Sequence, residues 1–437
     1  MRYTSFMAVL ESGKRNIAIL GAGFAGITAL VHLWKLLGRE NLQHEYQIVL
    51  ISNRAWHLYT PALYEIAAVP HGAMSSAILK RAICIPIEFI LGKFTGARFI
   101  AGEIAGMDPK RHTILFRNGD YLPYDYCIAA LGAETNDFGI PGVSEYAFGL
   151  KTFEDAIRLR NRAEELAINT DGILRIVIVG GGATGVELAA EFVNFFCEIK
   201  EASRTPGRCI EEITLLEAGP AILAGFHPTV VAGAAKRLEQ LGIRIRTNAV
   251  ITEVNAREAL LKNGGAIPYH LLVWSGGVMP ARALKQFGMP LDPKGRLLVN
   301  QNLEARPHVW AIGDCAGYTN PATGKPVPGN IPVAERQAER AAKNIVAVIQ
   351  RRTQYPFRPL KRWPFILTAG GKYAFADLGR MRFSGRIGWF AKQLVQLRYL
   401  ITILPFGRAI SVWMLGLRVW TSNDPGHRIP TQNRRPA

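Results

Sequence analysis

Two glycine-rich motifs of the form G-x-G-x-x-G constrain what this chain can fold into more than any other feature. Each follows an apolar, β-branched run and precedes a helix-like stretch, and their glycines are Gly21, Gly23 and Gly26 in the first and Gly180, Gly182 and Gly185 in the second. In such a motif the first glycine permits a tight turn after a strand. The second lets the backbone approach a pyrophosphate, and the third lets helix and strand pack closely. The sequence therefore predicts two dinucleotides with their phosphates at helix N-termini, in the simplest case a flavin cofactor and a nicotinamide substrate.

The length and charge of the chain bound the remaining possibilities. With 437 residues, 49% of them hydrophobic, the chain can bury two or three domain cores. Of the net charge of +18, +14 lies in residues 351–437, where 16 basic residues accompany only two acidic ones. The basic character is therefore a property of the C-terminal tail and predicts a partner for it.

Cysteine usage indicates a reducing compartment. No pair among the five cysteines has C-x-x-C or C-x4-C spacing, and their number is odd. We expect buried, unpaired thiols without a disulfide framework, and we expect no metal site. We also expect neither a signal peptide nor a transmembrane helix, because the first dozen residues lack a long apolar core and no run of 18 apolar residues is free of charge.

The order of strand-like and helix-like segments predicts an α/β protein with two Rossmann-like dinucleotide-binding domains. We assign residues 15–150 to the first part of the flavin-binding domain and residues 151–285 to the nicotinamide-binding domain. Residues 286–350 are expected to return to the first domain. Residues 351–437 are expected to form a basic, amphipathic helical region that associates with a membrane.

The residue after the second strand of each unit distinguishes the two dinucleotides. An acid at this place can hold the ribose hydroxyls of an adenosine. In the second unit it is Glu217, whose charge would repel a 2′-phosphate and therefore favours NADH over NADPH. In the first unit the place is taken by Ser52 and Asn53, which could make only neutral, weaker hydrogen bonds to a ribose.

Two further segments favour a flavin in the first unit. The apolar strand in residues 126–133 ends in small residues, among them Gly132, where the backbone could run close to a cofactor. Gly313 and Asp314 directly follow another strand-like run, and the carboxylate could accept a hydrogen bond from a ribityl chain. The alternative interpretation of this Gly-Asp pair is ordinary turn chemistry.

Taken in this order, these segments resemble the two-dinucleotide-binding-domain flavoprotein oxidoreductases, the FAD-dependent pyridine nucleotide-disulfide oxidoreductase superfamily, from residue 15 to about residue 345. Within that superfamily the chain is most similar to the type II, non-proton-pumping NADH:quinone oxidoreductases. The similarity rests on WHLYTPALY (residues 56–64), TNDFGIPG (135–142), VGGGATGVEL (179–188) and GKYAFADLG (371–379).

The resemblance implies FAD as cofactor, NADH as substrate and a membrane quinone as acceptor. NADH would give a hydride to FAD, and two electrons would then pass to the quinone, in a ping-pong cycle. The residues that would hold FAD are Gly21, Gly23, Gly26 and Asp314, and those that would hold NADH are Gly180, Gly182, Gly185 and Glu217.

Three more residues match functional positions of the family. Glu187 matches a glutamate near the flavin and nicotinamide that could relay protons, although an acid here also suits the start of a helix. Gln337 matches one glutamine of a stretch close to the quinone, in which Pro332 takes the place of another. Lys372 falls near a lysine at the quinone entrance, with a merely solvated lysine as the alternative.

The C-terminal tail itself predicts association with an anionic membrane surface. The segments 389–404 and 409–420 combine apolar faces with cations. Helices of this kind lie in a membrane interface, where Lys and Arg reach the headgroups while their stems cover apolar surface. We expect a peripheral protein on the cytoplasmic face of the cell membrane, and a homodimer through the same region could also form.

Other functions stay open at this point. A sulfide:quinone oxidoreductase needs a redox cysteine pair beside the flavin, for which Cys127 and Cys315 are the candidates. An NADH-dependent flavoprotein reductase could instead pass its electrons to a protein. A flavin-binding module with a nucleic-acid-binding tail is a remote alternative, because apolar runs such as residues 400–404 serve no purpose in a nucleic-acid arm. We therefore expect no nucleic-acid partner.

Overall fold

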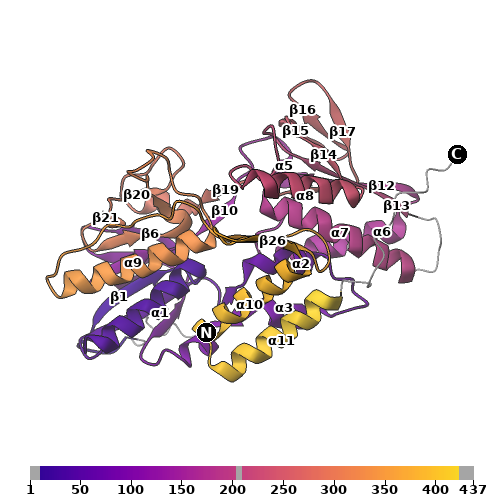
Figure 1. Ribbon diagram of the computed structural model, residues 1–437. Helices are drawn as coiled ribbons and strands as arrows, with labels where there is room; N and C mark the ends of the chain where they lie inside the picture. Colours follow the sequence, from indigo (N-terminus) through magenta and orange to yellow (C-terminus); the bar gives the residue numbers. More distant parts are fainter. Residues whose placement is uncertain (1–9, 203–208, 423–437) are drawn as a thin grey trace.

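The computed structural model describes residues 10–202 and 209–422, and its two largest β-sheets each contain the strand that leads into one glycine motif (Figure 1). The first sheet has six strands in the order β21-β22-β9-β1-β2-β5, parallel throughout except for β21 at the edge. Its strands are β1 (Arg15–Leu20), β2 (Tyr46–Ser52), β5 (Arg98–Ala101), β9 (Tyr126–Ala129), β21 (Glu304–Arg306) and β22 (Val309–Ala311). Two of these strands come from far along the chain and complete a sheet that begins at residue 15.

The second sheet has five parallel strands in the order β11-β18-β12-β13-β14. They are β11 (Phe148–Gly149), β12 (Gly172–Val179), β13 (Cys209–Leu216), β14 (Arg244–Arg246) and β18 (Leu271–Trp274). The second half of β12, residues 176–179, is a continuous buried β-branched run. Such a run suits a central strand that is covered by helices on both faces.

Smaller antiparallel sheets accompany both units. One is formed by β6 (Ile104–Asp108), β7 (Thr113–Phe116) and β8 (Tyr121–Pro123), and the other by β15 (Ile251–Val254), β16 (Glu258–Leu261) and β17 (Ala266–Pro268). An antiparallel pair of β10 (Ala133–Thr135) and β19 (Val278–Pro280) connects the two units. The remaining short pairs are β3 (Trp56–Leu58) with β4 (Cys84–Pro86), and β20 (Leu297–Leu298) with β23 (Ala316–Gly317).

Helices cover the sheets and present their N-termini to the glycine motifs. Helix α1 (Phe24–Arg39) begins within the first motif and packs against α9 (Ile331–Ile349), and α7 (Ala183–Ala202) begins within the second. Apolar residues of α1 recur on one face at helical spacing, and that face is buried. The other helices of the two units are α2 (Leu63–Ala67), α3 (Ser76–Ile83), α4 (Ile87–Leu91), α5 (Val143–Tyr146), α6 (Phe153–Asn169) and α8 (Pro228–Gln240).

The C-terminal region is a three-stranded antiparallel sheet followed by two helices, and it lies across both units (Figure 1). Its elements are β24 (Phe365–Thr368), β25 (Ala374–Asp377), β26 (Arg382–Gly385), α10 (Arg386–Ile403) and α11 (Phe406–Ser422). Strand β24 contacts α7 of the second unit, while α10 contacts α1 and α11 contacts α3 of the first. The sequence predicts the two helices but not this sheet, because strands of four residues leave little periodicity.

The two C-terminal helices hold each other through polar groups and expose apolar ones. The indole of Trp413 donates to the carbonyl oxygen of Gln393, and that of Trp420 donates to Oε1 of Gln396. Both glutamines are buried, and the exposed apolar side chains of α10 are Ile387, Phe390, Leu394 and Val395. These tryptophans therefore join the helices instead of facing outward. Within residues 10–202 and 209–422, no helix has both the length and the apolar content that crossing a membrane requires.

Candidate functional site

The first glycine loop has two packed glycines and one open glycine. Gly21 has φ of +108°, which L side chains rarely adopt, and a Cβ there would strike the carbonyl oxygen of Ala130. A Cβ at Gly26 would strike the carbonyl oxygen of Gly21, so this position brings helix and strand together. At Gly23 nothing lies within 4 Å of a Cβ position. The loop therefore leaves open space at the glycine that would face a pyrophosphate.

The second glycine loop repeats this geometry. Gly180 has φ of +104°, and a Cβ there would lie 2.5 Å from the carbonyl oxygen of Ser275. A Cβ at Gly185 would strike the carbonyl oxygen of Gly180, whereas the space at Gly182 is open within 4 Å. Both loops can thus admit a phosphate to the N–H groups at the start of a helix.

Glu217 is fixed beside the second loop at the end of β13. Its Oε2 accepts the N–H of Gly181 at 2.7 Å, and its Oε1 accepts the N–H of Gly219 at 2.7 Å. Because a carboxylate offers about four lone-pair sites, both oxygens can still accept hydrogen bonds from a ligand. The acid is therefore positioned by the backbone before any ligand binds.

The corresponding place in the first unit holds a neutral turn. Oγ of Ser52 accepts the N–H of Arg54 at 3.2 Å, and Asn53 is exposed. The guanidinium of Arg54 lies 3.9 Å from the carboxylate of Glu154. The second unit therefore has a carboxylate at the end of its second strand, and the first unit has a neutral turn there, as the sequence predicts.

A buried glutamine ties the Gly-Asp turn to α9. Oε1 of Gln337, which is completely buried, accepts the N–H of Gly313 at 2.7 Å. The next residue, Asp314, is partly buried in the short turn Gly313–Cys315. The thiol of Cys315 lies 3.7 Å from the carbonyl oxygen of Gly132, so the turn also meets the loop after β9. In the described part of the chain Nε2 of Gln337 has no hydrogen-bond partner, and leaving such a buried donor unpaired is costly.

Pro332 suits its position in the first turn of α9. Proline at the start of a helix loses nothing, because the N–H that it lacks would have no intrahelical partner there. Asn330 caps the same helix, with its Oδ1 accepting the N–H of Val333 at 2.9 Å. A proline is therefore compatible with the local structure at this position.

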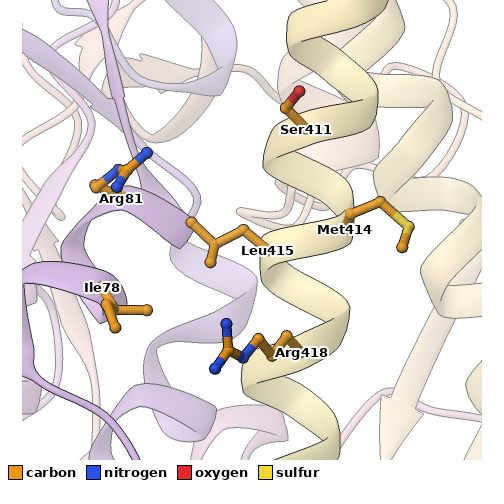
Figure 2. Close-up of a pocket in the computed structure, with 6 residues that line it drawn as sticks. All are labelled: Ile78, Arg81, Ser411, Met414, Leu415 and Arg418. Carbon is orange, nitrogen blue, oxygen red and sulfur yellow. The ribbon is translucent and has the colours of Figure 1, made fainter.

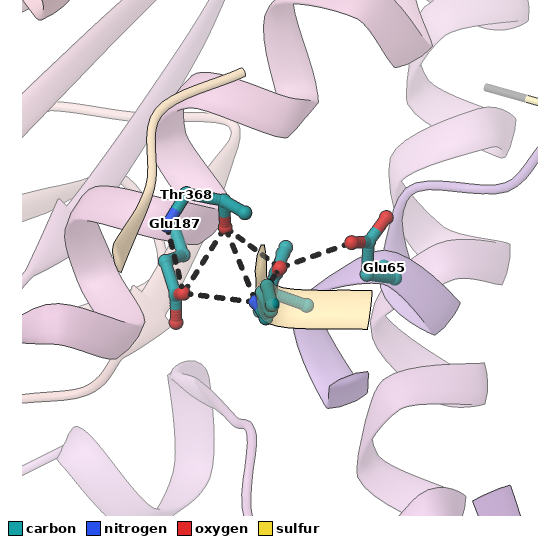
Figure 3. Close-up of polar contacts among 5 residues, drawn as sticks. Glu65, Glu187 and Thr368 are labelled. Carbon is teal, nitrogen blue, oxygen red and sulfur yellow. Dashed lines mark hydrogen bonds and ion pairs between the residues drawn. The ribbon is translucent and has the colours of Figure 1, made fainter. Parts of the chain in front are cut away.

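Glu187 lies at the centre of a polar network that joins four elements (Figure 3). From α7, its Oε1 accepts from the backbone N–H of Thr368 on β24 at 3.2 Å and lies 3.0 Å from the hydroxyl of that residue. The ammonium of Lys392, on α10, lies 3.2 Å from the same oxygen and also donates to the hydroxyl of Tyr64, on α2. The side chains of Glu187 and Lys392 are only 12% and 14% exposed, so the ion pair is largely desolvated.

The network continues to a second buried acid. The hydroxyl of Tyr64 donates to Oε1 of Glu65 at 3.0 Å. Thr368 has a single hydroxyl hydrogen and lies 2.6 Å from the Tyr64 oxygen, so it can donate either to Tyr64 or to Glu187. Burial raises the pKa of Glu65 to about 7, against the opposing charge of Lys392. Burial also raises the pKa of Tyr64, so its hydroxyl keeps its proton.

The sequence finds only one member of this network. Lys372, the lysine that the resemblance singles out, lies partly buried in the turn between β24 and β25. The lysine that contacts Glu187 is Lys392, near the start of the apolar segment that the sequence assigns to a membrane interface. Tyr64 is the last residue of the motif WHLYTPALY, and Glu65 directly follows it. That motif is the signal in the sequence that could have found these two residues.

His57 connects the C-terminal region to the first glycine loop. The ring is fully buried, with Nδ1 2.8 Å from the carbonyl oxygen of Ala22 and Nε2 2.8 Å from the hydroxyl of Tyr399 on α10. Because a carbonyl only accepts, Nδ1 carries the hydrogen and Nε2 accepts from Tyr399. Burial lowers the pKa of His57 to about 4, so the ring is neutral at neutral pH.

The cysteines near the first unit are poor redox groups. Cys127 and Cys315 are both free and fully buried. Burial raises the pKa of both thiols, to about 12 for Cys315. Because the thiolate is the reactive form, burial makes both thiols weak nucleophiles.

The first unit fits a flavin dinucleotide on its own geometry. The open space at Gly23 can take the pyrophosphate at the N-terminus of α1. The unpaired Nε2 of Gln337, beside the Gly-Asp turn, would gain its missing acceptor from a bound group. A buried polar atom without a partner is the feature expected of a site that a ligand completes.

Comparison with known proteins agrees with this geometry. The family model for the pyridine nucleotide-disulphide oxidoreductases matches residues 15–338. The type II NADH:quinone oxidoreductase NdhA of Mycobacterium tuberculosis is 30% identical over 423 residues, which cover 89% of this chain and 84% of that protein.

Two solved structures share the fold. The structure of NDH2 from Plasmodium falciparum in complex with NADH superposes with a TM-score of 0.78 at 20% identity, covering 94% of this chain and 99% of that one. The sulfide:quinone oxidoreductase of Aquifex aeolicus gives a TM-score of 0.69 at 19% identity, with 92% of each chain covered. The architecture alone thus does not separate the two activities, whereas the sequence relationship does. The chain belongs to the pyridine nucleotide-disulphide oxidoreductase family and, within it, to the type II NADH:quinone oxidoreductases.

Proposed function

We propose that this protein is an FAD-dependent enzyme that oxidises NADH and reduces a membrane quinone without pumping protons. The observation that carries the proposal is the pair of matching glycine loops, one in each unit, together with the buried network of Glu187 between them. FAD occupies the first loop, held by Gly21, Gly23, Gly26 and Asp314. NADH occupies the second, held by Gly180, Gly182, Gly185 and Glu217.

NADH is favoured over NADPH by charge. Glu217 is held beside the second loop by two backbone N–H groups and keeps acceptor sites for ribose hydroxyls. A 2′-phosphate at this place would face a fixed carboxylate, and like charges in contact cost free energy. The bound flavin supplies the two-electron chemistry that links the nicotinamide to the quinone.

Reduction of a quinone to a quinol consumes two electrons and two protons, and the hydride of NADH carries two electrons and one proton equivalent. One further proton must therefore come from the solvent, and side chains of the protein can relay it. Glu65, with a pKa of about 7, can bind and release a proton near neutral pH. The hydroxyls of Tyr64 and Thr368 connect it to Glu187 and Lys392 within hydrogen-bonding distance. We assign this network the delivery of protons toward the quinone, with Glu187 as its inner end. Gln337 fixes the Gly-Asp turn, and Lys372 serves the quinone entrance.

The quinone is reached from a membrane surface to which α10 and α11 bind. Ile387 and Phe390 are 72% and 55% exposed on α10, and Phe406 is 68% exposed on α11. Arginines accompany these apolar side chains on both helices, as in helices that lie in a lipid interface. The protein is therefore proposed to be peripheral, on the cytoplasmic face of the cell membrane. A homodimer through the same face is the competing use of these side chains.

An anaerobic spectroscopic titration tests the proposed function. The purified protein should show flavin absorbance that NADH bleaches and that a short-chain quinone restores. Bleaching without recovery would keep NADH as donor and indicate a protein acceptor instead of a quinone. A bound flavin that NADH leaves oxidised would refute the proposal and make sulfide the next donor to try.

A further inference from the structure

A groove of about 540 Å³ lies between α3 and α11, on the first unit (Figure 2). Its lining combines aliphatic and cationic side chains, contributed by Ile78, Arg81, Ser411, Met414, Leu415 and Arg418. Figure 2 shows Leu415 and Arg418 pointing from α11 toward α3. The groove is separate from the network of Glu187 and contains none of its residues.

The two arginines of the groove have no acidic partner in the part of the chain that the structure describes. Neither Arg81 nor Arg418 forms an ion pair with an acid in residues 10–202 and 209–422, and both are exposed. Two guanidinium groups without an acidic partner among the described residues thus line a groove whose other side chains are mostly apolar. A guanidinium binds a phosphate through two parallel hydrogen bonds, which an ammonium cannot do.

We propose that this groove binds the phosphate of one anionic phospholipid of the membrane, with Arg81 and Arg418 on the phosphate and an acyl chain along Ile78 and Leu415. Charge complementarity and the apolar side chains of the groove together select a lipid over a small anion, which would leave those side chains uncovered. Met414, 54% exposed at the rim, continues toward the exposed apolar side chains of the C-terminal helices. The inference rests on the proposed membrane association and names the molecule that this face recognises.

Variants that remove equal charge from different places can distinguish a discrete lipid site from general attraction to a negative surface. The groove variant is Arg81→Gln/Arg418→Gln. A second variant, Arg386→Gln/Arg398→Gln, removes two exposed cations from α10, and a third, Arg257→Gln/Lys262→Gln, removes two from the distant sheet β15–β17. All three change the net charge equally. Arg81→Lys/Arg418→Lys keeps the charge of the groove but loses the paired hydrogen bonds.

The measurement is binding of soluble dihexanoyl phosphatidylglycerol to the FAD-loaded, full-length protein, by calorimetry, with inorganic phosphate as the comparison. At about 1 kcal/mol per cation near a lipid phosphate, the groove variant should bind about 30-fold more weakly. The lysine variant should also bind more weakly than the wild type, whereas the α10 and distant-sheet variants should bind as the wild type does. The α10 variant should still lose affinity for phosphatidylglycerol vesicles.

Several results would overturn the inference. The first is that the short-chain lipid does not bind. The second is that the α10 and groove variants lose the same affinity for it, and the third is that inorganic phosphate binds as tightly as the lipid. A change of oligomeric state in the groove variant would assign the groove to a second copy of the chain and would likewise overturn it. NADH-dependent bleaching of the flavin, measured on the same samples, is independent of all these results. A failure of the lipid site is therefore distinguishable from a failure of the proposed function.

Discussion

The contact between Glu187 and Lys392 provides the sharpest test of the site, because its coupling can be worked out from the structure. The two charged atoms are 3.2 Å apart, and both side chains are largely removed from water. At an effective dielectric constant of about 20, this distance corresponds to about 5 kcal/mol of attraction. Part of this attraction is offset by the cost of desolvating both groups. We therefore expect a coupling free energy of about 2–3 kcal/mol, near the upper end for contacting residues.

The coupling is measured with a double-mutant cycle of Glu187→Gln, Lys392→Met and the combined variant. Each single substitution leaves one buried charge without its partner and should lower the free energy of unfolding by about 3–5 kcal/mol. The double variant should be more stable than the sum of the two losses predicts. Urea unfolding of the FAD-loaded protein, followed by circular dichroism and flavin fluorescence, gives the four free energies.

An exposed ion pair of the same chain serves as the matched control. Lys343 and Glu339 are 2.6 Å apart on α9, with side chains 46% and 40% exposed. Their coupling should not exceed about 0.5 kcal/mol, as for exposed helical pairs in general. If Glu187→Gln and Lys392→Met have additive effects, so that their coupling free energy is no larger than that of the surface pair, the buried network as described is refuted.

Three further predictions concern His57, Glu65 and the pair of glycines Gly23 and Gly26. The pKa of His57 is about 4 in the folded protein and 6.5 in the unfolded protein, so between these pH values only the unfolded state binds the proton. The free energy of unfolding should therefore fall by about 3 kcal/mol as the pH drops from about 6.5 to about 4. A His57→Gln variant should lack this loss, and parallel curves of stability against pH for variant and wild type would contradict the prediction. The effect of pH on stability has the opposite sign for Glu65, because its raised pKa means that the folded state holds the proton and loses stability as the pH rises from 4.5 to about 7. A Glu65→Gln variant should lack this loss of stability. Because the network is proposed to deliver protons to the quinone, the same variant should slow turnover with quinone more than it slows flavin reduction by NADH in stopped-flow kinetics. Gly26→Ala should destabilise the protein by about 1–3 kcal/mol, because its methyl group would collide with the carbonyl oxygen of Gly21. Gly23→Ala should fold normally but lose flavin on gel filtration. Equal flavin content in Gly23→Ala and wild type would exclude close approach of a phosphate at Gly23.

Some features of the site are written locally in the sequence. The spacing of glycines in each motif dictates a strand, a turn at positive φ and a helix start within about ten residues, so the sequence predicts both loops. Glu217 is the first residue after its strand, so its position at the strand end can be read from the sequence, whereas the hydrogen bond from Gly181 depends on the pairing of β13 with β12. The family follows from the same segments, because they occur in a fixed order along the chain.

Other features depend on contacts between distant segments. Lys392 and Tyr64 are 328 residues apart, and they meet because β24 and α10 fold back between the two units. The sequence assigns Lys392 to a membrane-facing helix and singles out Lys372 instead, because a cation within an apolar run has the same pattern whether it faces lipid or a buried carboxylate. Burial decides between these two surroundings, and burial is a property of the whole fold.

The sequence by itself thus determined the two dinucleotide loops, the α/β architecture and the family, since each rests on short-range spacing that local backbone geometry enforces. Only the tertiary structure decided which lysine pairs with Glu187, that Glu65 titrates near neutrality, and that His57 joins α10 to the first loop. It also decided that α3 and α11 each contribute an arginine to one groove, neither of them paired with an acid in residues 10–202 and 209–422. The physical reason is that ion pairing, desolvation and hydrogen bonding act over a few ångströms of space, whichever distance along the chain separates the partners.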